Sequence, residues 1–301
     1  MLYFNIYNLI YIGVDPMGYK YLADCHSHSN CSFDAEDPMQ AMCQKAQELG
    51  LAYYTITDHC ECDQYDGSAA FGGRKYRDTV VRSYAEFEEN QKRFPGLRFL
   101  KGIELGQPVQ NLEAAEDALR GRKYDFVIGS LHQIRSEEDF YWLNPESFSP
   151  ETLDDIFHRY FAEIMEMIEW GKFDSLAHIT YPLRYICRPG ERPSFAKYQD
   201  ELDAVLRGLI EKDIAIEFNT SRILRKNAPV LPDREIFTRY KALGGRRITL
   251  GADAHNTESI ASGIKEGLDL LRDIGFTEYT VYIDRSPVQV PIEYIPEEGK
   301  E

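Results

Sequence analysis

The sequence predicts an α/β fold in which parallel strands close into a barrel within a single domain. Seven short apolar runs alternate with helical patterns along the chain, and such alternation implies right-handed crossovers between parallel strands. The runs are continuously apolar, as is typical of strands covered on both faces. No repeat or linker divides the 301 residues, a length at which α/β barrels form one domain. A doubly wound open sheet is the competing architecture.

The individual elements follow from apolar runs and from helix start and stop signals. The predicted strands cover residues 21–26, 52–57, 98–105, 126–131, 175–179, 214–218 and 248–251, and a further run at 278–283 follows the last helix. Asp37-Pro38 predicts an N-cap and a first helical residue, and Gly50 ends that helix. Ser149-Pro150 opens a long helix that reaches about residue 170. Helices are also predicted over 195–212, 233–243 and 258–274.

Composition excludes some kinds of partner. The net charge of −16 argues against general binding to nucleic acid or to anionic membranes. A small anionic substrate is still compatible with this charge, because bound metal ions reverse the local potential. The sequence gives no indication of the oligomeric state.

Cysteine usage and the N-terminus bear on location. Five of the six cysteines precede residue 63 without a C-x-x-C pair, so we expect reduced thiols in a cytoplasmic protein. Residues 1–14 are apolar and aromatic but too short to span a bilayer, and they lack a basic segment and a cleavage site. We therefore separate an N-terminal extension, 1–16, from a domain over 17–301, and Met17 is a candidate native start.

Histidines and carboxylates follow the predicted strands at their C-terminal ends. In strand order these residues are His26 and His28, Asp58 and His59, Glu104, His132, His178, Glu217 and Asn219, and Asp253 and His255. Six of the seven histidines thus lie where the ends of parallel barrel strands converge on one face. Imidazole and carboxylate groups together are ligands for Zn, Fe or Mn. A lone strand histidine is more often a hydrogen-bonded core residue, but six at corresponding ends favour a metal site.

Spacing within these motifs adds detail. In His26-x-His28 both side chains of an extended segment point to one side, so both can reach one ion, and Asp253-x-His255 has the same spacing. The two oxygens of Glu104 suit a bridge between ions about 3.5–4 Å apart. Asp24 and Asp58 either orient the neighbouring imidazoles or are ordinary polar residues at strand ends. Glu217 lies in an apolar run and requires a buried partner. His158, inside a predicted helix, is assigned no role.

Four arginines lie on loops that follow the predicted strands, on the same face as the histidines. They are Arg135, Arg184, Arg188 and Arg222. Guanidinium groups recognise phosphate through paired hydrogen bonds, so in an acidic protein these residues are candidates for phosphate binding. The alternative for each is a solvent-exposed arginine.

The ordered set of motifs resembles the PHP (polymerase and histidinol phosphatase) family, and within it the monofunctional histidinol-phosphate phosphatases. The matching segments span about residues 20–256 and are Asp24-Cys25-His26-Ser27-His28, Thr57-Asp58-His59, Gly102-Ile103-Glu104, Gly129-Ser130-Leu131-His132, Ala177-His178, Glu217-Phe218-Asn219-Thr220-Ser221 and Gly251-Ala252-Asp253-Ala254-His255. Each piece is short, but their order is highly specific. The resemblance implies a distorted TIM-like (β/α)7 barrel with a trinuclear metal site.

Carried over from the family, the ligands divide into three groups. The first ion takes His26, His28, Glu104 and Asp253, the second takes Glu104, His132 and His178, and the third takes His59 and His255. Asp34 stands where many relatives supply a further histidine, and we include this carboxylate as a candidate ligand. Asp253, His255 and Glu104 are also the candidate catalytic residues.

The resemblance implies hydrolysis of a phosphate monoester, L-histidinol phosphate, to L-histidinol and phosphate in histidine biosynthesis. Two or three divalent ions would make hydroxide available at neutral pH, and arginines would offset charge on the phosphoryl oxygens. A first alternative is a PHP phosphoesterase acting on another small ester, such as a nucleotide or phosphotyrosine. A second is a metal-binding protein without catalysis.

Overall fold

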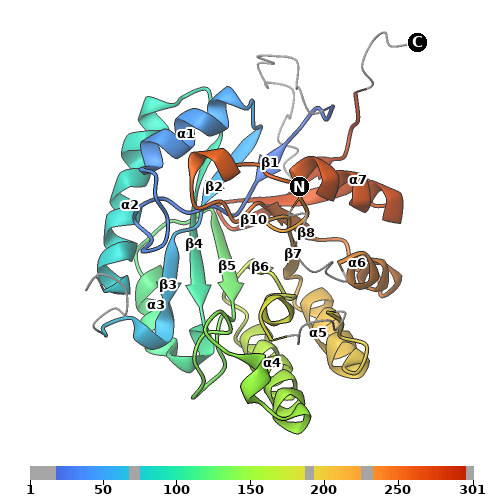
Figure 1. Ribbon diagram of the computed structural model, residues 1–301. Coiled ribbons are helices and arrows are strands. Elements are labelled where there is room, and N and C mark those ends of the chain that lie inside the picture. Colours follow the sequence, from blue (N-terminus) through green and yellow to red (C-terminus); the bar gives the residue numbers. More distant parts are fainter. Residues whose placement is uncertain (1–17, 68–74, 187–192, 225–232, 296–301) are drawn as a thin grey trace.

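Seven parallel strands lie side by side and form a nearly closed barrel surrounded by helices (Figure 1). The computed structural model describes residues 18–67, 75–186, 193–224 and 233–295. The strands follow one another in chain order: β1 (Ala23–Asp24), β2 (Tyr53–Ile56), β4 (Phe99–Gly106), β5 (Phe126–Ser130), β6 (Ser175–Leu176), β7 (Ala215–Asn219) and β8 (Ile248–Gly251). Sequential order with parallel pairing throughout confirms the predicted barrel and excludes the doubly wound sheet, whose strand order reverses.

The barrel closes between its first and last strands through the segment that carries the H-x-H motif. Cys25 N donates to the carbonyl oxygen of Leu250 at 2.9 Å, and Asp253 N donates to that of His26 at 2.8 Å. Ser27 and Ala254 form an isolated parallel bridge. The regular part of β1 is therefore shorter than predicted, because the chain beyond Asp24 remains extended but pairs mainly with the loop after β8.

A strand that the sequence did not predict, β3 (His59–Glu61), continues the direction of β2 after two residues. Both β2 and β3 pair with the long strand β4, and β3 places His59 opposite Glu104 and Glu61 opposite Gly106. Thr57 and Asp58 form the interruption. The interruption matters for function because it brings the ligand candidate His59 directly beside the carboxylate of Glu104.

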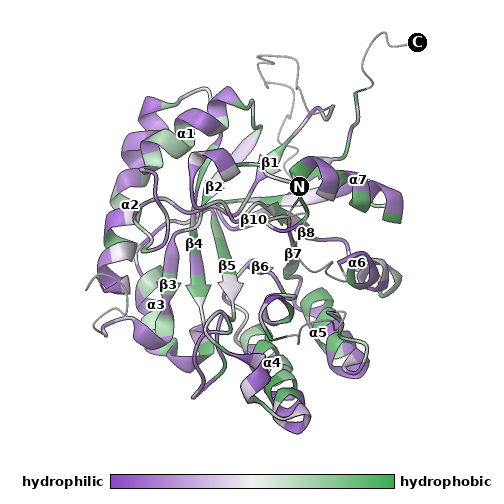
Figure 2. Cartoon of the chain, in the orientation of Figure 1, coloured by the Kyte–Doolittle hydropathy of each residue, from purple (hydrophilic) through white to green (hydrophobic). Residues whose placement is uncertain are grey.

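Helices cover the outside of the barrel with their apolar sides facing the strands (Figure 2). They are α1 (Met39–Glu48), α2 (Tyr76–Arg93), α3 (Leu112–Leu119), α4 (Pro150–Trp170), α5 (Gln199–Glu211), α6 (Asp233–Ala242) and α7 (Ile264–Ile274). In α4, Ser149 accepts a hydrogen bond from Thr152 N as a cap, and Gly171 ends the helix in the left-handed conformation, as predicted. No helix in the described ranges is both long and apolar enough to span a membrane.

Several predicted boundaries were wrong. Asp37 does not cap α1, because its carboxylate instead accepts a hydrogen bond from Thr257 N at 2.7 Å and ties the loop after β8 to this segment. Helix α5 begins at Gln199 rather than 195. Helix α7 begins at Ile264, after a separate 3-10 turn over Thr257–Ser259. Helices α2 and α3 were not predicted.

A β-hairpin lies at the N-terminal ends of the barrel strands, opposite the metal-ligand motifs. It consists of β9 (Glu278–Ile283), as predicted, and β10 (Ser286–Pro291), which was not predicted. Its turn residue Arg285 pairs with Asp174 before β6, and Arg285 N donates to the carbonyl oxygen of Asp125 before β5. The proposed extension 1–16 and the candidate start Met17 lie outside the described residues.

Candidate metal centre

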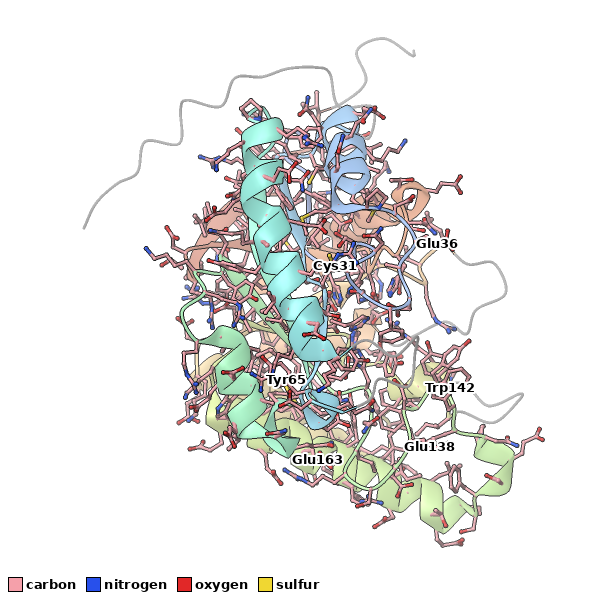
Figure 3. All side chains as sticks on the ribbon, turned by 90° about the vertical axis from the view of Figure 1, so that its left-hand side faces the viewer. Cys31, Glu36, Tyr65, Glu138, Trp142 and Glu163 are labelled. Carbon is pink, nitrogen blue, oxygen red and sulfur yellow. The ribbon has the colours of Figure 1, made fainter. Side chains whose placement is uncertain are left out.

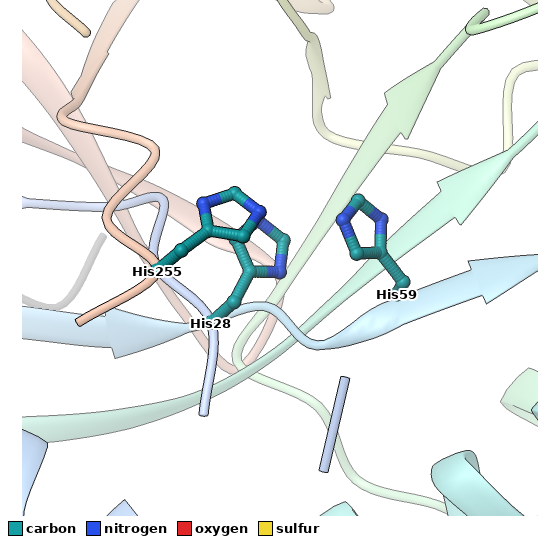
Figure 4. Close-up of side chains that lie close together, drawn as sticks. All are labelled: His28, His59 and His255. Atoms are coloured by element: carbon teal, nitrogen blue, oxygen red, sulfur yellow. The ribbon is translucent and has the colours of Figure 1, made fainter. Parts of the chain in front are cut away.

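The strand ends bring nine predicted ligand side chains together at the C-terminal face of the barrel. Four overlapping groups of at least three donors, each within 4.8 Å of one another, include all of them except Asp34. Figure 4 shows His28, His59 and His255 side by side, although they come from three different strand ends. The His28 and His59 rings stack at 4.2 Å with an interplanar angle of 14°.

The donors predicted for the first ion, His26, His28, Glu104 and Asp253, form the first donor group, and five of the six separations among them are close to those of a tetrahedral ligand set. His26 Nε2 and His28 Nε2 are 3.1 Å apart. Glu104 Oε2 lies 3.5 and 3.6 Å from these two atoms, and Asp253 Oδ1 lies 3.6 and 3.3 Å from them. Ligands at about 2.0–2.1 Å from a tetrahedral ion are about 3.3–3.4 Å apart. These five separations are those expected of donors that share one divalent ion.

The second group uses the other oxygen of Glu104. His132 Nε2 and His178 Nε2 each lie 3.2 Å from Glu104 Oε1, and they lie 3.4 Å from each other. Two imidazole nitrogens this close do not share a favourable direct contact unless a proton or a cation lies between them. The carboxylate of Glu104 thus faces both groups, as a bridging ligand requires.

The third group lies nearer to solvent. Asp34 Oδ2 is 3.1 Å from His255 Nε2 and 3.6 Å from His59 Nε2. His59 also faces the first group, because its Nδ1 lies 2.9 Å from Glu104 Oε2. Both of these last atoms are buried. His59 thus lies between the first and third groups, with one ring nitrogen facing each.

Electrostatics inside the cluster point to the same chemistry. Burial alone would raise the pKa of the Glu104 carboxyl, but the imidazoles of His59 and His26 hold it well below its usual range. Asp253 behaves in the same way, with its pKa lowered chiefly by His26. Burial together with His59 lowers the pKa of His28 to about 3. The carboxylates of Glu104 and Asp253 and the imidazole of His28 thus favour the protonation states in which they bind metal, whereas neighbouring carboxylates raise the pKa of His26, His59 and His132.

Two buried carboxylates fix the orientation of ligand histidines. Glu217 Oε1 lies 2.6 Å from His26 Nδ1, which must be the donor because a carboxylate only accepts. Glu61 Oε1 accepts from His132 Nδ1 at 3.1 Å in the same way. Each contact leaves Nε2 free to face an ion. The buried partner that the sequence required for Glu217 is therefore His26, whereas Glu61 was missed.

Glycines make room for these two carboxylates. A Cβ atom on Gly106 would lie 2.0 Å from Glu61 Oε2, and one on Gly251 would lie 2.6 Å from Glu217 Oε1 and 2.3 Å from His26 Cβ. Only the absence of a side chain lets each carboxylate lie against the neighbouring strand. Neither pairing was recognisable in the sequence, because in each the glycine and the carboxylate belong to different strands.

Asp24 and Asp58 orient backbone and hydroxyl groups rather than touching imidazole nitrogens. Asp24 accepts from the backbone N–H groups of Ala252 and Ala261, which anchors the loop after β8. Asp58 accepts from Ser32 Oγ at 2.8 Å, and this hydroxyl also lies 3.5 Å from His28 Nδ1. Asp58 therefore contacts His28 only through the hydroxyl of Ser32. Asp24 acts on the backbone of the loop after β8 instead.

The structure separates the four arginines. Arg184 is almost fully buried, with 5% of its side chain exposed; it donates to Asn219 Oδ1 at 2.9 Å and lies 3.9 Å from Asp253 Oδ2. Its Nε is buried without a hydrogen-bond partner among the described residues. Arg222 lies over the ring of Tyr185 at 5.5 Å.

Arg135 is directed away from the donor groups. Arg135 pairs with Glu166 at 2.6 Å and donates to the carbonyl oxygen of Val109, so its guanidinium is turned towards α4 and away from the ligand cluster. The loop that carries it starts at the strand end but bends outwards, which the sequence did not reveal. Arg188 lies outside the described residues. His158, exposed on α4, pairs with Glu201 and takes no part.

A cavity of about 1120 Å³ opens directly above the donor groups. Its floor includes Asp34, His59, His132, His178, Asp253 and His255, with Arg184 beside them. One wall is the loop between β5 and α4, which contributes Glu137, Glu138 and Asp139 and the aromatic rings of Tyr141 and Trp142. Figure 3 shows Glu138 and Trp142 together on the right-hand side of that view. The cavity therefore combines a cationic arginine at its floor with an acidic and aromatic wall.

The profile of the PHP domain matches residues 24–221, which is more than half of the chain. The chain belongs to the PHP domain family. The matched region begins at Asp24, immediately before the H-x-H motif, and ends at Ser221, after the strand that carries Glu217. The family resemblance inferred from the strand-end motifs is thereby confirmed.

Individual relatives extend the comparison over most of the chain. A probable histidinol-phosphatase from Clostridium acetobutylicum is 28% identical over 251 residues, 82% of this chain and 91% of that protein. Histidinol-phosphatase from Lactococcus lactis is 24% identical over 260 residues, 86% of this chain and 93% of that protein. The crystal structure of histidinol phosphate phosphatase from Lactococcus lactis, complexed with zinc, L-histidinol and phosphate, superposes with a TM-score of 0.71 at 23% identity, covering 89% of this chain and 98% of that one. This likeness confirms the predicted fold.

Proposed function

We propose that this PHP protein hydrolyses L-histidinol phosphate to L-histidinol and phosphate. The observation that carries the proposal is the set of imidazole and carboxylate donors around Glu104, with the buried guanidinium of Arg184 at its edge and a cavity above it. The relatives named histidinol-phosphatase support the choice of substrate. The cytoplasmic location is part of the proposal and rests on the five described cysteines, all of which are free thiols.

The donor groups suit two or three divalent ions, and zinc, iron and manganese all accept this mixture of nitrogen and oxygen ligands. When bound, such ions supply Lewis acidity and lower the pKa of water to about 7. His26, His28, Glu104 and Asp253 would hold the first ion, Glu104, His132 and His178 the second, and Asp34, His59 and His255 the third. The separations between donors within each of these sets are 3.1–3.6 Å, as expected for ligands on a shared ion.

The protein's own residues would orient the phosphate group and balance its charge. Arg184 faces Asp253 Oδ2 at 3.9 Å, and Asn219 Nδ2 lies 3.3 Å from the same oxygen, whereas Asp253 Oδ1 faces His26 and His28. One side of this carboxylate thus faces the first donor group and the other faces the arginine. Arg184 would offset negative charge on the phosphoryl oxygens of a phosphate group bound in this cavity as the ester bond breaks. Asp253 and His255 line the cavity, but both are already proposed as ligands, so no residue is assigned to deliver a proton to the departing alkoxide.

The cavity wall favours a cationic substrate over the alternatives. Glu138 and Asp139 line the cavity, and burial raises the pKa of Asp139 from its ordinary value. Histidinol phosphate carries an amine and an imidazole, which suit carboxylates and the rings of Tyr141 and Trp142. A nucleotide presents further negative charge to this wall, and phosphotyrosine presents a carboxylate as well as an amine. Other small phosphate esters nevertheless share the same metal chemistry and are included in the test.

The test is phosphate release by the zinc-, manganese- or iron-loaded protein from histidinol phosphate, nucleoside monophosphates and phosphotyrosine. We expect turnover of histidinol phosphate to exceed the others clearly, and comparable rates on nucleotides would favour the broader phosphoesterase. His132→Ala should abolish activity, whereas the matched variant His158→Ala should retain it, because His158 is exposed on α4 and far from the donors. Fully metallated wild-type protein without any phosphatase activity would support the non-catalytic alternative.

A further inference from the structure

Gln107 has an unusual backbone conformation for its residue type. It follows the last residue of β4 and adopts φ 46° and ψ 47°, in the left-handed region. Residues other than glycine seldom adopt this conformation unless contacts with the surroundings offset its conformational free-energy cost. Only 1% of Gln107 is exposed. The contacts of the buried Gln107 amide must therefore stabilise this backbone conformation.

The amide group of Gln107 contacts the ligand candidate His132 directly and also through a second residue. Its Oε1 accepts from His132 N at 3.0 Å, and its Nε2 donates to Glu61 Oε2 at 2.7 Å and to Asp63 Oδ1 at 3.2 Å. The other oxygen of Glu61 accepts from His132 Nδ1 at 3.1 Å. One side chain thus fixes both the backbone and the ring of His132. Since the N–H of His132 needs an acceptor and the Glu61 carboxylate needs a donor, the two ends of the amide are not interchangeable.

The consequence is that His132 Nε2 is held towards Glu104 and His178, where the second donor group forms. Gly106 contributes, because Glu61 lies against its Cα where a side chain would collide. Nδ1 of His132 is covered by Glu61, so the ring has one orientation in which all its contacts are satisfied. Second contacts of this kind orient metal ligands and increase their basicity.

We propose that Gln107 is a positioning residue that sets the affinity of the second donor group for its ion, acting through Glu61 and His132. This inference rests on one part of the proposed function, namely that the second donor group binds a divalent ion. It assigns a role to a side chain that touches neither the ion nor the substrate. Loss of the amide is expected to weaken binding of one ion by about 10–100-fold and to leave the first group intact, because His26 and His28 have no contact with Gln107.

The experiment compares zinc retention by the zinc-loaded wild type and the zinc-loaded Gln107→Met variant against increasing concentrations of a chelator. Met has a similar size but offers no hydrogen bond to Glu61 or to His132. We expect one equivalent of zinc to be lost at about 10–100-fold lower chelator concentration, and the remainder to be retained as in the wild type. The matched control is Gln133→Met, since Gln133 donates to Asp63 at 2.8 Å in the same network but contacts neither Glu61 nor the ring of His132. Its zinc retention should equal that of the wild type.

A second pair of variants keeps the test decisive if Gln107→Met fails to fold. Gln107→Glu places a second carboxylate against Glu61 and should lose zinc in the same way. Combining it with Glu61→Gln exchanges the two groups, restores one donor and one acceptor, and should recover part of the lost affinity. Wild-type retention in a folded Gln107→Met protein, or no recovery in the exchange variant, would overturn the inference. Failure of the proposed function would appear separately, as a wild-type protein that binds zinc but does not hydrolyse histidinol phosphate.

Discussion

Replacement of Glu217 by alanine should weaken metal binding and folding together. Its carboxylate is buried and accepts three hydrogen bonds: from His26 Nδ1 at 2.6 Å, from His178 N at 2.8 Å and from Asn219 Nδ2 at 3.2 Å. The first two donors are themselves buried, and leaving each unsatisfied costs about 1–3 kcal/mol. We therefore expect Glu217→Ala to lose about 2–6 kcal/mol of unfolding free energy. Because the His26 ring also loses its orientation, zinc affinity should fall by about 10–100-fold.

The assay combines urea unfolding with zinc determination on the same dialysed samples. Glu163→Ala is the matched control, since Glu163 is equally buried and accepts from Arg135 N at 2.7 Å and from Gln110 Nε2 at 2.9 Å, but lies on α4 without contact to a ligand candidate (Figure 3). The control should lose stability but keep its zinc. If Glu217→Ala retained zinc as tightly as the control does, Glu217 would be a structural residue only, and the orientation of His26 would have another cause.

Two further predictions concern charge at the centre. Arg184→Ala should lower kcat/KM on the phosphate ester by about 10–100-fold, the equivalent of a lost charge-assisted hydrogen bond of about 1.5–3 kcal/mol, without changing zinc content; unchanged kinetics would remove Arg184 from the phosphate site. Zinc binding should release protons, and zinc affinity should fall as the pH is lowered. Nearby carboxylates raise the pKa of three candidate ligand histidines well above its ordinary value, although burial acts in the opposite direction; these are His26, His59 and His132. The metal-free protein therefore holds these rings protonated at neutral pH. A bound ion must displace their protons. Uptake of zinc in weakly buffered solution with a pH indicator measures this release, and its absence would contradict the assigned protonation states.

The ligand candidates were predictable because their signal is local. His26-x-His28 and Asp253-x-His255 follow strands whose apolar pattern is continuous, and the topology of a parallel barrel places all such strand ends on one face. That these side chains lie close together could therefore be predicted without knowing the loop conformations. The same holds for Glu104, whose position at the end of a long central strand lets it face two donor groups.

The orienting residues were not predictable because their contacts cross between strands. Glu61 lies between two cysteines and carries no motif, and it reaches His132 only because β2 is interrupted at Thr57 and β3 then pairs beside Gly106. The position of the Gln107 amide depends on a left-handed backbone conformation, and a glutamine in the sequence does not predict that conformation. Arg135 illustrates the opposite error, since its place after a strand predicted an inward side chain, whereas nearby acidic residues of α4 draw it outwards.

The most direct test of the metal centre is anomalous X-ray scattering at the zinc edge from crystals of zinc-loaded protein. We expect two strong peaks about 3.5–4 Å apart, one on each side of the Glu104 carboxylate, the first among His26, His28 and Asp253 and the second between His132 and His178. A third, weaker peak should lie near Asp34 and His255, the most exposed donors. A map without zinc beside Glu104, from protein that elemental assay shows to contain zinc, would contradict the metal centre and the hydrolytic function built on it.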